Sequence, residues 1–96
     1  MHPHITIVIP IYNEEENIPE LHSRLTAVME GLCGTQGFPP GGYEVTMVDD
    51  GSTDRSWQLI QGLHQRYGRV KGISFSRNFG HHIALTAGLD TARAMQ

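Results

Sequence analysis

The 96-residue sequence lacks several features by which protein classes are recognised. It has one cysteine, Cys33, so it cannot form an intrachain disulfide, which fits a reducing compartment. It has one lysine, Lys71, and a net charge of −3, which argues against a nucleic-acid module held by a basic patch. No run approaches the ~20 apolar residues of a membrane span. The run 5–11 is too short for a signal peptide and is interrupted by Pro10. We therefore expect a soluble chain, unless a membrane part has been cut away.

Two further absences concern cofactors. The six histidines are scattered, and no spacing matches a structural zinc site, so we expect no metal site within this chain. No Gly-x-Gly-x-x-Gly follows the first apolar run, and Gly-x-x-x-x-Gly-Lys-Ser is missing. The usual cradles for dinucleotides and triphosphates are therefore disfavoured.

Apolar runs and helical periodicities alternate along the chain. Strands are predicted at 5–11, 43–48 and 70–75. Helices are predicted at 18–32, from a cap at Ser52 or Thr53 to a stop at Gly68, and at about 81–95. The order β-α-β-α-β-α predicts an α/β fold, with parallel strands, right-handed crossovers and helices on both faces of the sheet.

We interpret residues 1–96 as the N-terminal half of one longer domain. Three parallel strands leave two open edges, and doubly wound sheets usually continue beyond the first strand. The third helix is apolar nearly all round, so we expect it to be covered on most sides. An open edge also favours a homo-oligomer. The segment 31–43, with five glycines and two prolines, predicts an irregular loop.

Ligands of open α/β sheets bind beyond the carboxyl ends of the strands, where three polar segments are expected here, at 10–14, 49–52 and 76–82. In the second, Asp49 and Asp50 repel each other unless donors, a cation or a ligand offset their charge. We expect one aspartate to be structural, by bonding nearby backbone N–H groups or by capping the next helix. Asp50 is the better candidate for a ligand contact.

The first segment carries groups suited to a nucleoside. Pro10 is expected to end the strand's hydrogen-bond ladder, because it has no N–H to donate. Tyr12 can stack on a planar base, and Glu14 can accept hydroxyl or base N–H groups. For Glu15 and Glu16, a solvated helix start is the better interpretation.

The third segment carries the single cation of the three. Arg77 offers a fork of donors that suits a diphosphate, and Gly80 lets backbone approach a ligand closely. An alternative is that Asn78 and Gly80 only shape the turn while Arg77 pairs with a local carboxylate such as Asp49. The residues alone leave these two interpretations open.

These segments resemble a known family. Residues 8–18 (Val-Ile-Pro-Ile-Tyr-Asn-Glu-Glu-Glu-Asn-Ile) and 48–54 (Val-Asp-Asp-Gly-Ser-Thr-Asp) resemble the start of a family 2 glycosyltransferase of the GT-A fold. Residues 74–81 (Ser-Phe-Ser-Arg-Asn-Phe-Gly-His) and 84–89 (Ala-Leu-Thr-Ala-Gly-Leu) are similar to the branch with dolichyl-phosphate mannosyltransferase and bactoprenol glucosyltransferases. The fold class implied is a three-stranded, Rossmann-like half of a truncated GT-A nucleotide-diphospho-sugar transferase domain.

The resemblance implies transfer of a sugar, with inversion, from a UDP- or GDP-linked donor to an acceptor, which the branch indicates is a polyprenyl phosphate. It implies a divalent cation, Mg²⁺ or Mn²⁺, and a location at the cytoplasmic face of a membrane for the full-length protein. The residues that match the family's nucleotide pocket are Pro10, Tyr12, Glu14, Val48 and Asp50. Further candidate contacts to the diphosphate or donor are Asp49, Arg77, Asn78 and Gly80.

The family's Asp-x-Asp metal motif and catalytic base would lie beyond Gln96, so we expect this chain to be inactive alone and assign no catalytic residue. Two alternatives stay open. One is a family 2 transferase with a saccharide or other acceptor. The other is a non-catalytic nucleotide-binding or regulatory α/β module.

Overall fold

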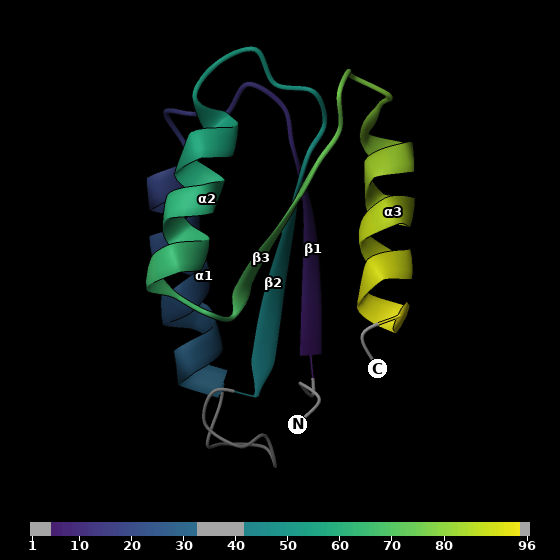
Figure 1. Ribbon diagram of the computed structural model, residues 1–96. Helices are drawn as coiled ribbons and strands as arrows, with labels where there is room; N and C mark the ends of the chain where they lie inside the picture. The colour runs from purple at the N-terminus through teal and green to yellow at the C-terminus, as the bar shows by residue number, and fades with distance from the viewer. Residues whose placement is uncertain (1–4, 33–41, 95–96) are drawn as a thin grey trace.

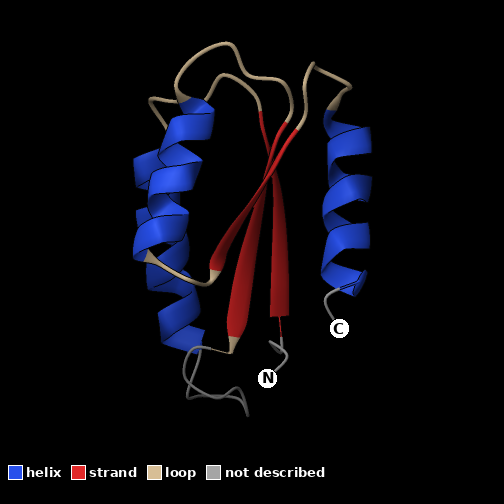
Figure 2. Ribbon diagram, viewed as in Figure 1, coloured by secondary structure: helices blue, strands red, loops and turns tan. Residues whose placement is uncertain are grey.

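The computed structural model describes residues 5–32 and 42–94, and its six elements alternate as the sequence predicts. The elements are β1 (Ile5–Ile11), α1 (Ile18–Leu32), β2 (Tyr43–Asp49), α2 (Ser56–Arg66), β3 (Val70–Ser74) and α3 (His81–Ala94), as Figure 2 shows. Most of the loop predicted at 31–43 lies outside the described residues. Within the described ranges, no helix has the length and apolar character needed to cross a bilayer.

The three strands form one parallel sheet in the order β1-β2-β3. Helices α1 and α2 lie on one face of this sheet and α3 lies on the other (Figure 1). The predicted fold class is therefore confirmed. All three strands point the same way, so their carboxyl ends meet at one edge of the molecule, where the three connecting loops lie together (Figure 1).

The core lies between the sheet and the pair α1 and α2. Its fully buried members include Ile18 of α1, Met47 of β2 and Ile60 of α2. At 25 cal/mol per Å² of apolar surface, burying one such side chain stabilises the fold by about 1.5–3 kcal/mol. This face of the sheet fixes the positions of the strand ends.

The opposite face carries α3, which contacts β1 and β2. Ala84 is fully buried, and Gly88 sits so close to the sheet that an added Cβ would lie 2.3 Å from Val8 Cγ1. Ile83 and Leu89, on the other sides of the helix, are about half exposed, at 47% and 55%. Within the described residues only the small residues of α3 face the sheet, and the expectation that a longer domain covers its other sides stays a prediction. Oligomerisation through the open edge stays a prediction.

Pro10 does not end the ladder as expected. It pairs in register with Val48, and β1 continues to Ile11, whose carbonyl accepts the N–H of Asp50 at 2.8 Å. Successive residues of a strand point their backbone groups to opposite sides. Because Ile11 bonds toward β2, the missing N–H of Pro10 falls on the open edge of β1, where it removes no ladder bond.

Helix α2 begins later than predicted. It begins at Ser56, with Arg55 as the capping residue and no side-chain capping bond, so Ser52 and Thr53 do not cap it and bond other partners. It ends at Arg66, where the extended capping residue Tyr67 donates its N–H to the Leu63 carbonyl at 2.8 Å. The predicted stop, Gly68, follows directly after this cap, although its φ is not positive.

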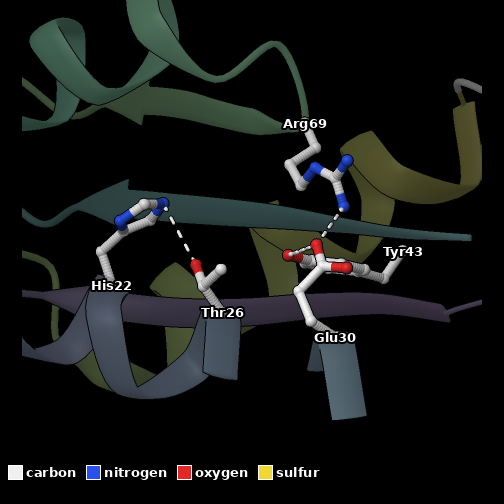
Figure 3. Close-up of polar contacts among 5 residues, drawn as sticks. All are labelled: His22, Thr26, Glu30, Tyr43 and Arg69. Atoms are coloured by element: carbon white, nitrogen blue, oxygen red, sulfur yellow. Dashed lines mark hydrogen bonds and ion pairs between the residues drawn. The ribbon is translucent and has the colours of Figure 1, made fainter. Parts of the chain in front are cut away.

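Side-chain contacts join the elements at the amino-terminal end of the sheet. The Tyr43 hydroxyl donates to Glu30 at 3.3 Å, and Arg69 pairs with the same carboxylate at 3.4 Å (Figure 3). The Arg69 guanidinium lies 4.5 Å from the centre of the Tyr43 ring. This cluster ties the end of α1 to β2 and to the turn before β3, far from the loops at the other end.

Candidate functional site

Three loops extend beyond the carboxyl ends of the strands: the first loop (12–17), the second loop (50–55) and the third loop (75–80). The second loop continues the sheet, since the Asp50 N–H bonds the Ile11 carbonyl. The third does the same, because the Phe75 N–H donates to the Asp49 carbonyl at 2.9 Å. The prediction that the polar segments 10–14, 49–52 and 76–82 meet beyond the carboxyl ends of the strands is confirmed, and we call this edge of the molecule the rim.

Asn13 joins the first loop to the second. Its side-chain oxygen accepts the N–H of Thr53 at 2.8 Å and that of Asp54 at 3.3 Å. Its own N–H donates to the Ser52 hydroxyl at 2.9 Å. Asn13 has a φ of 50°, a left-handed conformation that asparagine tolerates better than most residues. Sequence reasoning gave Asn13 no role, although an asparagine after a strand is a signal for such a turn.

Asp54 and Ser56 make a second link between these loops. The Ser56 hydroxyl accepts the Glu14 N–H at 2.9 Å, and the Asp54 carboxylate accepts the Glu15 N–H at 3.2 Å. Desolvation opposes ionisation of Asp54, but hydrogen bonds from Ser56 and from the Glu15 amide outweigh it, so the pKa of Asp54 lies below its ordinary value. The carboxylate form thus holds the first loop in place.

Asp50 joins the second loop to the third. Its carboxylate accepts the N–H of Phe79 at 2.8 Å and of Gly80 at 2.9 Å. The Asn78 amide donates to the carboxylate at 3.3 Å and to the Asp50 carbonyl at 3.2 Å. Asp50 therefore does not cap the helix that follows it, α2. It bonds the segment that leads into α3, thirty residues along the chain.

The other predicted residues of β2 are also below the surface. Asp49 is 2% exposed, and its carboxylate accepts the Ser52 N–H at 3.3 Å. Val48 is fully buried on the side of α3, where its Cγ2 would lie 3.1 Å from a Cβ added at Gly88. Asp49 and Val48 therefore lie beneath the surface of the three loops.

The groups of the three loops that face solvent include an aromatic ring, an acid and a cation. Tyr12 is 38% exposed. Glu14 is half-buried and accepts the Asn17 amide through one carboxylate oxygen at 2.7 Å. Arg77 is exposed, and its guanidinium lies 4.6 Å from the centre of the Phe79 ring, which itself meets Phe75 edge to face. Among the described residues Arg77 makes no ion pair, so it does not pair with Asp49.

The described residues do not fit the divalent cation that the resemblance implies. No group of three or more His, Cys, Asp or Glu side chains in 5–32 and 42–94 is placed to hold a metal ion. The carboxylates of Asp49 and Asp50 both accept backbone N–H groups.

A cavity of about 450 Å³ between α2 and β3 is lined by residues such as Trp57, His64 and Lys71, and none of its lining residues belongs to the three loops. The three loops carry the flat ring of Tyr12, the carboxylates of 14–16 and the forked cations Arg55 and Arg77. That arrangement suits a ligand that is planar at one end and anionic at the other.

Comparison with known proteins gives the family. The family model of glycosyl transferase family 2 matches residues 6–94. An uncharacterised glycosyltransferase of Bacillus subtilis, YkcC, is 45% identical over 92 residues, which is 96% of this chain and 26% of YkcC. The undecaprenyl-phosphate 4-deoxy-4-formamido-L-arabinose transferase of Aeromonas hydrophila is 40% identical over 90 residues, 93% of this chain and 26% of that protein. This chain thus spans about a quarter of the length of these curated relatives.

Solved structures agree on the fold. Staphylococcus aureus TarS 1–349 in complex with UDP matches with a TM-score of 0.70 and 27% identity, over 95% of this chain and 24% of TarS. The mannosyltransferase PcManGT of Pyrobaculum calidifontis, in complex with GDP-Man and Mn²⁺, matches with a TM-score of 0.66 and 24% identity, over 95% of this chain and 25% of that chain, which supports the fold alone. The chain therefore shares the GT-A fold of these structures, of which it spans about a quarter, and belongs to glycosyl transferase family 2.

Proposed function

We propose that the rim binds the nucleotide of a nucleotide-sugar, as part of a transferase whose acceptor is a polyprenyl phosphate. The observation that carries this proposal is the convergence of the three loops, with Tyr12 and Arg77 facing outward at one edge. The UDP bound by the TarS relative and the undecaprenyl-phosphate acceptor named for the Aeromonas hydrophila relative support it.

Each exposed group has a chemical role in the proposal. The Tyr12 ring stacks on the base, and a free oxygen of Glu14 accepts a base or ribose donor. The Arg77 guanidinium binds the diphosphate, because a charged fork matches two phosphate oxygens. Pro10, Val48 and Asp50 stay in the proposed site as its floor, and Asp49, Asn78 and Gly80 hold the loops that carry the contacts.

The proposed reaction is a displacement at the anomeric carbon. A phosphate oxygen of the acceptor forms the new bond, the bond from the anomeric carbon to the diphosphate breaks, and the nucleoside diphosphate leaves with inversion. A lipid phosphate is already an anion, so it needs no base to remove a proton. Residues that hold the cation, and the rest of the transferase site, would lie in the part of the relatives that this chain does not span. Because polyprenyl phosphate lies in a bilayer, we place the reaction at the cytoplasmic face of a membrane.

Calorimetric titration with UDP, GDP and uridine tests the nucleotide site. Tyr12→Ala should weaken the binding of UDP and of uridine alike, by about fivefold or more, since base–aromatic stacking contributes about 1–3 kcal/mol. Arg77→Gln should lower the affinity for UDP and leave the affinity for uridine unchanged, because uridine has no diphosphate. Arg24→Gln is the matched control, because Arg24 is an exposed arginine on α1 that pairs with Glu20 away from the rim. If Arg77→Gln and Arg24→Gln changed the affinity for UDP equally, the proposed contact between Arg77 and the diphosphate would be wrong.

The acceptor is tested separately, in protein of the relatives' full length. Transfer to undecaprenyl phosphate, with none to the dephosphorylated alcohol, is the expected result. Transfer to a soluble saccharide instead would favour the alternative acceptor class. Nucleotide binding without transfer to any acceptor would favour a regulatory module.

A further inference from the structure

The cavity between α2 and β3 lies at the outer edge of the sheet, away from the three loops. Its volume of about 450 Å³ falls within the range of about 300–1,000 Å³ that small-molecule sites occupy in proteins. Trp57 and Ile60 of α2 line one side, and Gly72 and Ile73 of β3 line the other. The cavity is therefore large enough for a small organic molecule and offers it a largely apolar surface.

Gly72 allows α2 to approach β3 closely at this cavity. A Cβ added there would lie 2.8 Å from Ile60 Cγ2 and 3.0 Å from Trp57 Cζ3. Because glycine has no side chain, the Trp57 ring lies against the backbone of β3 and is held in place. Trp57 is half-buried, so part of its side chain stays accessible. A fixed and accessible indole ring is a surface on which an aromatic ligand can stack.

The backbone of Gly72 faces the open edge of the sheet. The Phe75 N–H donates to the Asp49 carbonyl of β2 at 2.9 Å, and successive residues of a strand point their backbone groups to opposite sides. Phe75, Ile73 and Lys71 therefore bond toward β2, while the Gly72 N–H points away from it. No described strand covers that edge. A hydrogen-bond donor thus stands beside the cavity.

The charge at the cavity is positive. Lys71 is among the lining residues, and none of the described residues that line the cavity carries a carboxylate. Lys71 is half-buried, and neither of the two ion pairs within 5–32 and 42–94 includes it. An ammonium group without a partner, next to the Gly72 N–H, favours an anion over a cation.

A peptide strand is the other ligand that an open sheet edge can take. The edge of β3 is poorly suited to it. The Val70 N–H already donates to the Tyr67 carbonyl at 3.0 Å, and the Val70 carbonyl accepts a bond from His64 Nδ1 at 2.6 Å. Of the outward-facing residues of β3 as described, only Gly72 and Ser74 keep backbone groups for a partner. Such a short ladder favours a small molecule over a peptide.

We propose that this cavity binds a small aromatic carboxylate. The ring of the ligand stacks on Trp57, and its carboxylate accepts hydrogen bonds from the Lys71 ammonium and the Gly72 N–H. This second site shares no lining residue with the three loops, so it is independent of the proposed nucleotide site.

NMR titration of the chain tests the ligand class. Trp57 is the single tryptophan, so its indole N–H gives one resonance that reports on the cavity. Phenylpropionate is the ligand used, and phenylpropanol and phenylpropylamine replace its charge by none and by the opposite one. We expect the acid to bind most tightly, the alcohol about fivefold more weakly, and the amine most weakly. An amine that binds as tightly as the acid, or an indole resonance that the acid does not shift, would overturn the inference.

Charge removal at Lys71 provides the second measurement. Lys71→Gln should lower the affinity for phenylpropionate about fivefold and leave the affinity for phenylpropanol unchanged. Arg24→Gln is the matched control, because Arg24 is an exposed cation on α1, and it should change neither affinity. Equal losses for the acid and the alcohol in Lys71→Gln would overturn the proposed ion pair.

Filling the cavity provides the third measurement. Gly72→Ala should remove binding of phenylpropionate, because the added methyl group displaces Trp57 and Ile60. Gly62→Ala is the matched control on α2, since nothing lies within 4 Å of its added Cβ, and it should bind as before. Unchanged binding in Gly72→Ala would overturn the inference, as would competition between phenylpropionate and UDP.

The unaltered chain supplies a test if Gly72→Ala fails to fold. Cyclohexylpropionate has the carboxylate of phenylpropionate without its aromatic ring, so it should bind more weakly. Equal affinity for the two acids would overturn stacking on Trp57. Binding of a short acidic peptide along β3, with no binding of phenylpropionate, would instead assign the edge to a peptide.

Discussion

Gly51→Ala offers a severe test of how the second and third loops fit together. The added Cβ would lie 2.2 Å, 2.4 Å and 2.7 Å from three backbone atoms of Arg77 and Asn78. Carbon atoms in contact normally sit about 3.5–4.0 Å apart, so more than an ångström of movement is needed. Backbone atoms cannot rotate away as a side chain can. The third loop must therefore shift, or the second loop must change its φ of +75°.

The expected magnitude is the sum of two contributions. An L-residue in a left-handed conformation costs about 1–2 kcal/mol. Overpacking that forces backbone shifts costs about 1–3 kcal/mol. We expect Gly51→Ala to lower the free energy of unfolding by about 2–5 kcal/mol, which for a chain of this size is a melting temperature lower by roughly 8 °C or more.

Gly80→Ala separates the two contributions. Gly80 also has a positive φ, +100°, but nothing lies within 4 Å of its added Cβ. It should therefore show the conformational cost of about 1–2 kcal/mol without the overlap. Urea unfolding followed by circular dichroism measures both variants. Equal losses at Gly51 and Gly80, or a loss below about 1 kcal/mol at Gly51, would refute the close fit of the loops.

Three further predictions concern other parts of the chain. Gly88→Ala should destabilise by about 1–2 kcal/mol in urea unfolding, because overpacking against Val8 exceeds the gain in helix propensity; a stabilised variant would contradict the close approach of α3. His22 has a pKa lowered from 6.5 by desolvation and by the charge of Arg66, so its contribution to stability is present above pH 6.5 and is lost as the pH falls through the lowered value. In His22→Gln the melting temperature should therefore change less between pH 7 and pH 5 than in the unaltered chain. The same change in both would show that another group causes the pH dependence. Asn13→Ala should cost about 1–3 kcal/mol by loss of its acceptor and by its left-handed φ, and Asn13→Gly should cost less; the reverse order in thermal melts would exclude strain at this position.

The order of elements and their common edge could be predicted from the sequence, because those depend on local patterns. Each strand is a short apolar run, each helix carries an apolar face, and their alternation leaves little choice of topology. Parallel strands then place all three following loops at one end, so the convergence of Tyr12, Asp50 and Arg77 needed no knowledge of side-chain positions.

The partners of individual polar groups could not be predicted in the same way. Ser52 and Thr53 have the chemistry of helix caps, but they bond Asn13, about forty residues away, and helix α2 starts later. Pro10 has no N–H wherever it stands, but the effect depends on which side of β1 faces β2. Such choices are made by tertiary contacts that a local pattern does not contain.

The charges at the rim illustrate why those partners matter for the ligand. Three aspartates lie at or just past the end of β2, and left bare they would repel a diphosphate. Each instead accepts backbone N–H groups: Asp49 from Ser52, Asp50 from the third loop, and Asp54 from Glu15. These amide donors offset the carboxylate charges where they stand. Arg55 of the second loop and Arg77 of the third loop are both exposed, so cations stand at this edge although the chain has a net charge of −3.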